Sequence, residues 1–97
     1  YKLIPKNGVY VVKSVFGGSN VFGMMNIGFN PTVNGTSKTI EIHFFNFDED
    51  LYGQKMQVRL LTRLRDEKKF NSLDDLKLQL VKDEQSASDF IRKNYAQ

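Results

Sequence analysis

The sequence predicts an α+β fold in which a small, curled antiparallel sheet or partial barrel is followed by a C-terminal helix. Segments rich in β-branched and aromatic residues alternate with turn signals through most of the chain. The last quarter instead places apolar residues at helical spacing. The chain has 97 residues, which is enough for one domain and not for two.

The first predicted element is a strand over residues 8–16, because GVYVVKSVF is rich in valine and aromatic side chains. Residues 17–20 (GGSN) predict a turn of the kind found in hairpins. Residues 21–28 form the returning strand, in which Gly23 marks a bulge or a close approach of another backbone. The proline, asparagine and glycine within residues 30–37 predict a loop.

Residues 38–45 (KTIEIHFF) show the cleanest alternation of side chains and predict a third strand. One face carries Ile40, Ile42 and Phe44, whereas the other carries Thr39, Glu41, His43 and Phe45. A fourth strand is predicted over residues 54–64. Four strands leave unpaired edges, and a closed barrel needs more strands than this chain supplies.

The last predicted element is a helix over residues 73–95. Ser72 is its expected N-cap, and Asp74 and Asp75 in the first turn suit the positive end of the helix dipole. An apolar stripe at helical spacing consists of Leu73, Leu76, Leu80, Ala87 and Ile91. This stripe predicts that the helix packs on the sheet.

Composition excludes several classes of function. The formal charge of +3 is mild and does not indicate nucleic-acid binding. With no cysteine and a single histidine, a thiolate nucleophile and a multi-histidine zinc site are excluded. The chain has no apolar run of the ~20 residues that cross a bilayer, no P-loop and no dinucleotide-binding glycine motif. We therefore predict a cytoplasmic protein without nucleic-acid or membrane partners.

Glu41 and His43 are the first candidates for chemistry, because they lie two residues apart on one face of the third strand. A carboxylate there can take a proton from a hydroxyl group as its oxygen attacks. The alternative is an ordinary exposed sheet face, on which glutamate and histidine are common. Spacing alone favours the alternative.

A basic segment after the fourth strand is the second candidate. Arg65, Lys68 and Lys69 can hold a phosphate or carboxylate, and Phe70 can stack on a flat ring. The alternative is a solvated run of charges in which Phe70 anchors the helix to the core. These residues alone favour that alternative.

Several short motifs follow one another in an order that points to a family. GVY (8–10) opens the first strand, NIGFNPT (26–32) follows the hairpin and EIH (41–43) lies in the third strand. DLYG (50–53), LRDEKKF (64–70) and SL (72–73) come next. In this order and spacing the chain resembles the riboflavin kinase family, including the carboxy-terminal module of bacterial bifunctional FAD synthetases.

The resemblance implies a six-stranded Greek-key β-barrel, here incomplete at about four strands, and an activity. The family transfers the terminal phosphate of ATP to the 5′-hydroxyl of riboflavin, giving FMN and ADP, and uses Mg²⁺. Glu41 matches the catalytic carboxylate, which acts as the base for that hydroxyl. Positions that match nucleotide contacts are Phe44, Asn46 and Tyr52. Positions that match flavin contacts are Arg65, Glu67, Lys68 and Phe70, with Glu67 and Lys68 competing for one role.

One family segment has no counterpart in this sequence. A glycine-rich stretch that ends in Pro-Thr-Ala-Asn serves the magnesium–nucleotide site and is expected before Gly8. Residues 31–34 (PTVN) imitate it, but their position matches a structural element, so Thr32 and Asn34 are expected to shape a loop and not to bind metal. Residues 1–97 are therefore expected to be the C-terminal part of the kinase domain, with little activity alone. A preceding FMN adenylyltransferase domain is a further expected partner.

Two other classes of function stay open. One is a module that binds flavin or nucleotide without catalysis. The other is a small β-barrel that binds single-stranded nucleic acid, with Tyr10, Phe16 and Phe22 as stacking side chains. The even charge balance and the ordered motifs favour the kinase over both.

Overall fold

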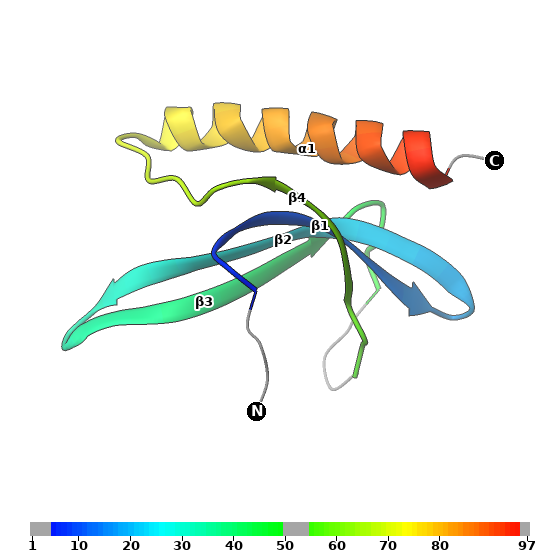
Figure 1. The fold of residues 1–97 in the computed structure, drawn as a ribbon, viewed down its shortest axis with the longest axis horizontal. Helices are drawn as coiled ribbons and strands as arrows, with labels where there is room; N and C mark the ends of the chain where they lie inside the picture. Colours follow the sequence, from blue (N-terminus) through cyan, green and yellow to red (C-terminus); the bar gives the residue numbers. More distant parts are fainter. Residues whose placement is uncertain (1–4, 50–54, 96–97) are drawn as a thin grey trace.

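The computed structural model describes residues 5–49 and 55–95. Its elements along the chain are β1 (Gly8–Phe16), β2 (Ser19–Thr32), β3 (Gly35–Phe44), β4 (Arg59–Arg65) and α1 (Leu73–Tyr95). The strands form one antiparallel sheet in the order β3-β2-β1-β4, and α1 runs alongside it (Figure 1). The predicted α+β class is confirmed, and over the described residues the sheet is open, with β3 and β4 at its edges.

The hairpin of β1 and β2 forms the centre of the sheet. Its pairing runs from Phe16 and Ser19 beside the turn to Gly8 opposite Ile27 at the far end. The side chains of Val11 and Val12 are fully buried, at 0% exposure. This agrees with the prediction from the valine-rich sequence, because β-branched side chains pack well on a pleated surface.

The hairpin of β2 and β3 is longer than the sequence predicts. The expected loop over residues 30–37 is wrong, because β2 continues to Thr32, β3 begins at Gly35 and only residues 33 and 34 form the turn. Pro31 is paired with Thr36 inside this ladder. Proline is tolerated there because β1 pairs with β2 only as far as Ile27, which leaves this end of β2 with a free edge.

Gly23 allows β2 and β3 to approach each other closely. A Cβ atom at this position would overlap the backbone carbonyl oxygen of His43. The predicted close approach of another backbone is therefore found, and Gly23 lies opposite Phe44 in the register of the two strands.

The fourth strand begins later than predicted. Residues 55–58 are not part of a strand, and β4 pairs with β1 from Arg59 opposite Lys13 to Arg65 opposite Val9. A side-chain hydrogen bond links this stretch to β1. The hydroxyl of Ser14 donates a hydrogen bond of 2.7 Å to the carbonyl of Gln57. The alternation in this stretch thus reflects packing without strand pairing.

The two faces of the sheet have different roles. The core cluster on one face comprises Tyr10, Val12, Met25 and Ile27, with Phe44 and Val58 packed against it. Ile40 and Ile42 lie opposite Ile27 and Met25 in register, and they stay 56% and 40% exposed because β3 is an edge strand. By strand alternation, Glu41 and His43 point to the opposite face, where α1 lies.

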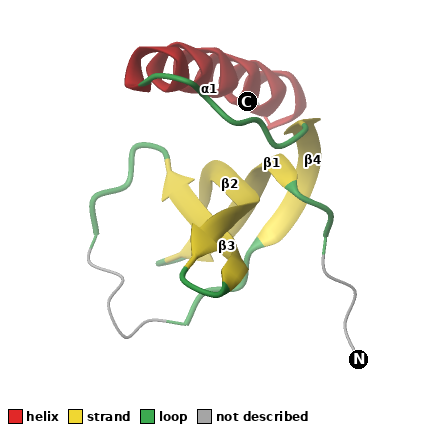
Figure 2. Ribbon diagram, turned by 90° about the vertical axis from the view of Figure 1, so that its left-hand side faces the viewer, coloured by secondary structure: helices red, strands yellow, loops and turns green. Residues whose placement is uncertain are grey.

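Helix α1 has the predicted bounds and covers the face of the sheet opposite the core cluster (Figure 2). Ser72 caps it, because its hydroxyl oxygen accepts a hydrogen bond of 3.1 Å from the backbone N–H of Asp75. Ala87 and Asp83 are its buried residues. Within the described part of the chain, no helix is both long enough and apolar enough to cross a membrane.

Candidate active site

A cleft of about 470 Å³ opens where the sheet, the chain after β4 and the first half of α1 meet. The sheet contributes Asn26, Gly28, Asn30, Thr39 and Glu41; the end of β4 and the chain after it contribute Arg65, Glu67, Lys68, Lys69, Phe70 and Asn71; the helix and its cap contribute Ser72, Leu73, Leu76 and Leu80. Most of these residues are polar or charged, and Phe70, Leu73, Leu76 and Leu80 give the cleft an apolar part.

A second hollow of about 330 Å³ adjoins the first, between the sheet and α1. Both hollows are lined by Asn26, Glu41, Arg65, Leu76 and Leu80. The second adds Val9, Met24, Ile42, His43 and Asp83. The predicted base and the first predicted flavin contact therefore lie where the two hollows meet.

Glu41 lies in the middle of β3, directly opposite Asn26 of β2. Directly opposed residues on one face have Cβ atoms about 4.5–5.5 Å apart, so the two side chains are neighbours. The structure thus places an exposed carboxylate and an amide side by side in the cleft. Asn26 was not among the predicted site residues, although strand alternation places it on the helix-covered face of β2.

His43 shares the face of Glu41, as the alternation predicts. It lines the smaller hollow and not the larger cleft. Its ring packs edge-on against Phe45, with centroids 5.7 Å apart. Of the two candidates, only Glu41 reaches the cleft that the basic segment lines.

Arg65 ends β4 and directs its guanidinium group to α1. Its Nε donates to Oδ1 of Asp83 at 2.8 Å, and its Nη2 donates to Oδ2 at 2.7 Å. Gln79 donates a further hydrogen bond of 3.0 Å to Oδ1 of the same carboxylate, which is 3% exposed. Arg65 therefore joins the sheet to the helix as well as lining the cleft.

The surroundings of Asp83 keep it charged. Burial by itself raises its pKa, but the hydrogen bonds from Arg65 and Gln79 and the charges of Arg65 and Lys68 leave the pKa below its ordinary value. Asp83 was not among the residues predicted from the sequence. An acid at helical spacing between Leu80 and Ala87, inside the apolar stripe, was the signal that could have revealed it.

Phe70 is flanked by two cations. The Nζ atom of Lys68 lies 5.6 Å from the centre of its ring, and the Cζ atom of Arg65 lies 6.0 Å from it. Cations at this distance are attracted to the ring face. The structure thus brings together the three predicted flavin contacts Arg65, Lys68 and Phe70 along one side of the cleft.

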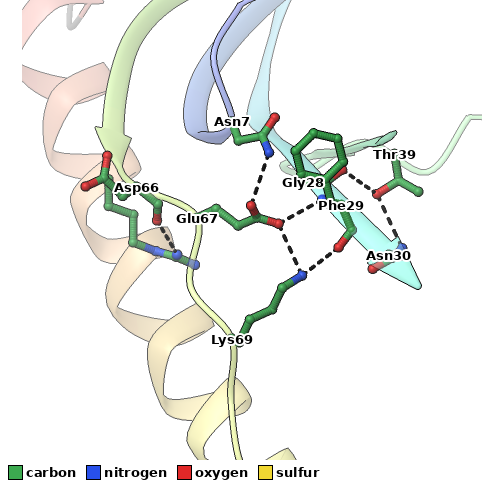
Figure 3. A network of polar contacts seen from close by, with 9 residues as sticks. Asn7, Gly28, Phe29, Asn30, Thr39, Asp66, Glu67 and Lys69 are labelled. Atoms are coloured by element: carbon green, nitrogen blue, oxygen red, sulfur yellow. Dashed lines mark hydrogen bonds and ion pairs between the residues drawn. The ribbon is translucent and has the colours of Figure 1, made fainter. Parts of the chain in front are cut away.

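Glu67, the fourth predicted flavin contact, is hydrogen bonded inside the protein (Figure 3). Its Oε2 accepts the backbone N–H of Phe29 at 2.8 Å, and its Oε1 accepts the side-chain amide of Asn7 at 3.1 Å. The hydrogen bond from Phe29 is the main cause that lowers the pKa of Glu67, and Lys69 and Asn7 lower it further against the effect of desolvation.

The positions predicted for the nucleotide are not gathered in this cleft. Phe44 packs against the core cluster on the other face of β3 and edge-on against Phe47, with ring centroids 5.8 Å apart. Asn46 has a φ of 52° and lines a separate hollow of about 340 Å³ beside Phe22. Tyr52 lies outside the described residues.

Comparisons with known proteins agree with the motifs. The family model of riboflavin kinase (Flavokinase) matches residues 1–91. The bifunctional riboflavin kinase/FMN adenylyltransferase of Haemophilus influenzae is 41% identical over 88 residues, which are 90% of this chain and 29% of that protein. The RNA-binding riboflavin kinase RibR of Bacillus subtilis is 42% identical over 79 residues, which are 80% of this chain and 34% of that protein.

A solved structure is also similar over nearly the whole chain. It is described as a macrolide-efflux protein from Streptococcus pneumoniae and matches with a TM-score of 0.74 and 34% identity, covering 96% of this chain and 29% of that one. This chain thus spans about a third or less of each of these proteins. Because the family model covers residues 1–91 and the motifs lie within that match, the chain belongs to the riboflavin kinase family.

Proposed function

We propose that this chain forms the part of a riboflavin kinase that holds the flavin and supplies the catalytic base. The enzyme transfers the terminal phosphate of ATP to the 5′-hydroxyl of riboflavin and releases FMN and ADP. One observation carries the proposal. Glu41 lies in the same cleft as the Arg65–Phe70 side and the apolar helix wall, in a volume suited to a small molecule.

Glu41 acts as the base in the proposed reaction. It accepts the proton of the 5′-hydroxyl while that oxygen forms a bond to the terminal phosphorus of ATP. The bond from this phosphorus to the bridging oxygen breaks, and ADP leaves with the electron pair. Such a base works when it is held within hydrogen-bond reach of the attacking oxygen. Asn26, opposite Glu41, is placed to orient a hydroxyl of the ribityl chain.

The flavin ring occupies the wider part of the cleft in this proposal. Phe70 offers a face on which a flat ring can stack, and Leu76 and Leu80 offer an apolar surface on the helix side. Lys68 lies beside Phe70 and supplies positive charge near the phosphate of FMN, whereas Arg65, whose charge is paired with Asp83, lines the same side of the cleft. The ring and its phosphate thus meet complementary groups.

ATP and a divalent cation complete the reaction, as the family implies. Phe44, Asn46 and Tyr52 remain proposed nucleotide contacts. Over residues 5–49 and 55–95, no group of three or more histidine or carboxylate side chains is arranged to hold a metal ion. In the proposal Glu41 acts as a base, and no residue of this chain is assigned as a metal ligand.

An FMN adenylyltransferase domain in the same polypeptide is a further part of the proposal. It is supported by the bifunctional relatives, in which the matching region is 29% of the Haemophilus influenzae protein. The two activities act in sequence, because the product FMN is the substrate of adenylyl transfer.

Two assays test the function. Riboflavin is titrated into the 97-residue chain while flavin fluorescence is followed, and FMN formation from riboflavin and ATP with Mg²⁺ is measured in the full-length protein by chromatography. We expect quenching on binding and conversion to FMN. Binding without any conversion would support a flavin-binding module instead. Salt-sensitive binding of single-stranded oligonucleotides without flavin binding would instead support a domain that binds single-stranded nucleic acid.

A further inference from the structure

Beyond the end of its pairing with β1, β2 has backbone groups that form hydrogen bonds with side chains, at Phe29. The pairing of β1 with β2 ends at Gly8 opposite Ile27, so β1 provides no partner for Phe29. Its N–H donates to Oε2 of Glu67 at 2.8 Å, and its carbonyl accepts a hydrogen bond of 2.6 Å from Nζ of Lys69. The two side chains thus satisfy backbone groups as a neighbouring strand would.

The same two side chains also bind each other and a third segment. Nζ of Lys69 lies 3.2 Å from Oε2 of Glu67, and the amide of Asn7 donates to Oε1. These contacts join the residues before β1, the end of β2 and the chain after β4 (Figure 3). We call Asn7, Phe29, Glu67 and Lys69 the Phe29 clamp. The carboxylate at its centre has a side chain that is 24% exposed.

Gly28 is the residue that makes room for this clamp. A Cβ atom at Gly28 would overlap Oε2 of Glu67, the atom that binds the N–H of Phe29. A side chain at this position would therefore push the carboxylate away from the edge of β2. The glycine and the glutamate are 39 positions apart in the sequence. The position of the Glu67 carboxylate nevertheless limits the size of the side chain that position 28 can hold.

We propose that Glu67 and Lys69 are positioning residues for the flavin and that Gly28 admits them. In this proposal they act on the flavin site through the backbone of Phe29, although both side chains line the cleft. They fix both ends of a short stretch in which Lys68 lies between Glu67 and Lys69, and Phe70 follows directly. The clamp thereby sets where Lys68 and Phe70 stand in the cleft. The inference rests on the proposed function, since it assigns these residues a role at the flavin site.

A double-mutant cycle tests the pairing of Gly28 with Glu67 without any ligand. Gly28→Ala, Glu67→Ala and the double variant are unfolded with urea, and the stability is compared. We expect Gly28→Ala to destabilise the wild-type chain but to have little effect when Glu67 is already alanine, because the space is then free. Equal effects of Gly28→Ala in both backgrounds would overturn the proposed pairing.

Flavin affinity tests the positioning role, and it is measured at a temperature where circular dichroism shows each variant to be folded. We expect Glu67→Ala and Lys69→Met each to weaken riboflavin binding about tenfold, with no additive loss when they are combined, since both act through Phe29. Glu67→Gln should restore most of the affinity, because its carbonyl oxygen can accept the N–H of Phe29. Lys77→Met, on the exposed side of α1, is the matched control and should change nothing.

The measurements distinguish a failure of the proposed function from a failure of the positioning role of Glu67 and Lys69. If wild-type chain binds no riboflavin, the proposed function fails, while the stability cycle still decides the pairing of Gly28 and Glu67. If wild-type chain binds and Lys69→Met has full affinity while Glu67→Ala does not, Glu67 contacts the flavin directly and the positioning role is wrong. If neither variant loses affinity, the clamp has no role at the flavin site.

Discussion

Three carboxylates line the two hollows, and the structure gives them different surroundings. Glu67 and Asp83 are held by hydrogen bonds within the protein, and both have a lowered pKa. Among the described residues, no hydrogen-bond partner holds Glu41. A base must be free to meet an incoming hydroxyl, so these surroundings support the proposal that Glu41, and not Glu67 or Asp83, acts as the base.

Replacement of Glu41 tests its role at the residue scale. We expect Glu41→Gln in the full-length protein to lower the turnover of riboflavin to FMN by about a hundredfold to ten-thousandfold, because the amide cannot take the proton. Riboflavin affinity should stay within about threefold, since the shape of the side chain is kept. Turnover is measured by chromatography and affinity by fluorescence. Glu84→Gln, on an exposed part of α1, is the control; near-normal turnover of Glu41→Gln would remove the base from the mechanism.

At the scale of elements, the ion pair of Arg65 and Asp83 connects β4 to α1 through two hydrogen bonds. Both hydrogen bonds join charged groups, and Asp83 is almost fully buried. Removal of one partner leaves the other charge without compensation in a largely buried site. The docking of the helix should therefore depend on this pair more than on the pairs at the surface.

Asp83→Asn measures that dependence. We expect a loss of about 3 kcal/mol in the free energy of unfolding, at the low end for a broken buried pair, because the side chain of Arg65 keeps 18% exposure. Urea unfolding followed by circular dichroism gives the value. Asp89→Asn removes the exposed pair with Arg92 on the same helix and should cost no more than about 0.5 kcal/mol. Equal losses of unfolding free energy for the two variants would show that the Arg65–Asp83 pair stabilises the docking of α1 no more than a surface pair does.

The lowered pKa of Asp83 gives this stabilisation a defined dependence on pH. Folding lowers the pKa below its ordinary value of 3.8, so the contribution is complete above that value and is lost as the pH falls through the folded-state pKa. Asp66 and Glu67 shift in the same direction, so the wild type alone does not isolate the effect. We expect the stability difference between wild type and Asp83→Asn to shrink steadily below about pH 4. A difference that is constant down to pH 2 would contradict this.

The sequence predicted elements well where local chemistry decides them. The strand over residues 8–16 and the helix over residues 73–95 have their predicted bounds, because a run rich in valine and aromatic residues and a serine cap act locally. Residues 30–37 were predicted wrongly because the effect of Pro31 depends on whether β2 has a neighbour on that side. The stretch before Arg59 alternates but pairs with no strand, and alternation alone does not distinguish the two cases.

The candidate site was predicted only in part for a related reason. Glu41 follows from strand alternation and the family motif, and the structure places it in the cleft with Arg65. The Phe29 clamp does not follow from either, because Gly28 and Glu67 meet only once β2 and the chain after β4 are folded together. Asp83 lies in an apolar stripe, but its partner Arg65 is 18 positions away on another element.

At the scale of the whole molecule, the sheet has two inner and two outer strands. Among residues 5–49 and 55–95, β1 is paired on both sides, with β2 and β4, whereas β3 is paired only with β2. Val11 and Val12 of β1 are fully buried, while Ile40 and Ile42 of β3 are partly open to solvent. Resistance to local opening should therefore decrease from the centre of the sheet to β3.

Hydrogen exchange tests this gradient. We expect the paired amides of β1 to exchange about tenfold or more slowly than those of β3, because opening β1 breaks pairing on two sides. Nuclear magnetic resonance with the 97-residue chain resolves single amides. Uniform protection over β1 and β3 would mean that the sheet opens only as a unit.

The position of α1 as one wall of the cleft has a thermodynamic consequence. A molecule that fills the cleft touches the sheet and the helix together, so it binds the docked arrangement and not one in which the helix has separated. Mass action then favours the closed assembly by about 2.7 kcal/mol when the free ligand reaches a hundred times its dissociation constant. Occupancy thus reinforces the fold, and the thermal midpoint of this small domain rises with the concentration of what it binds.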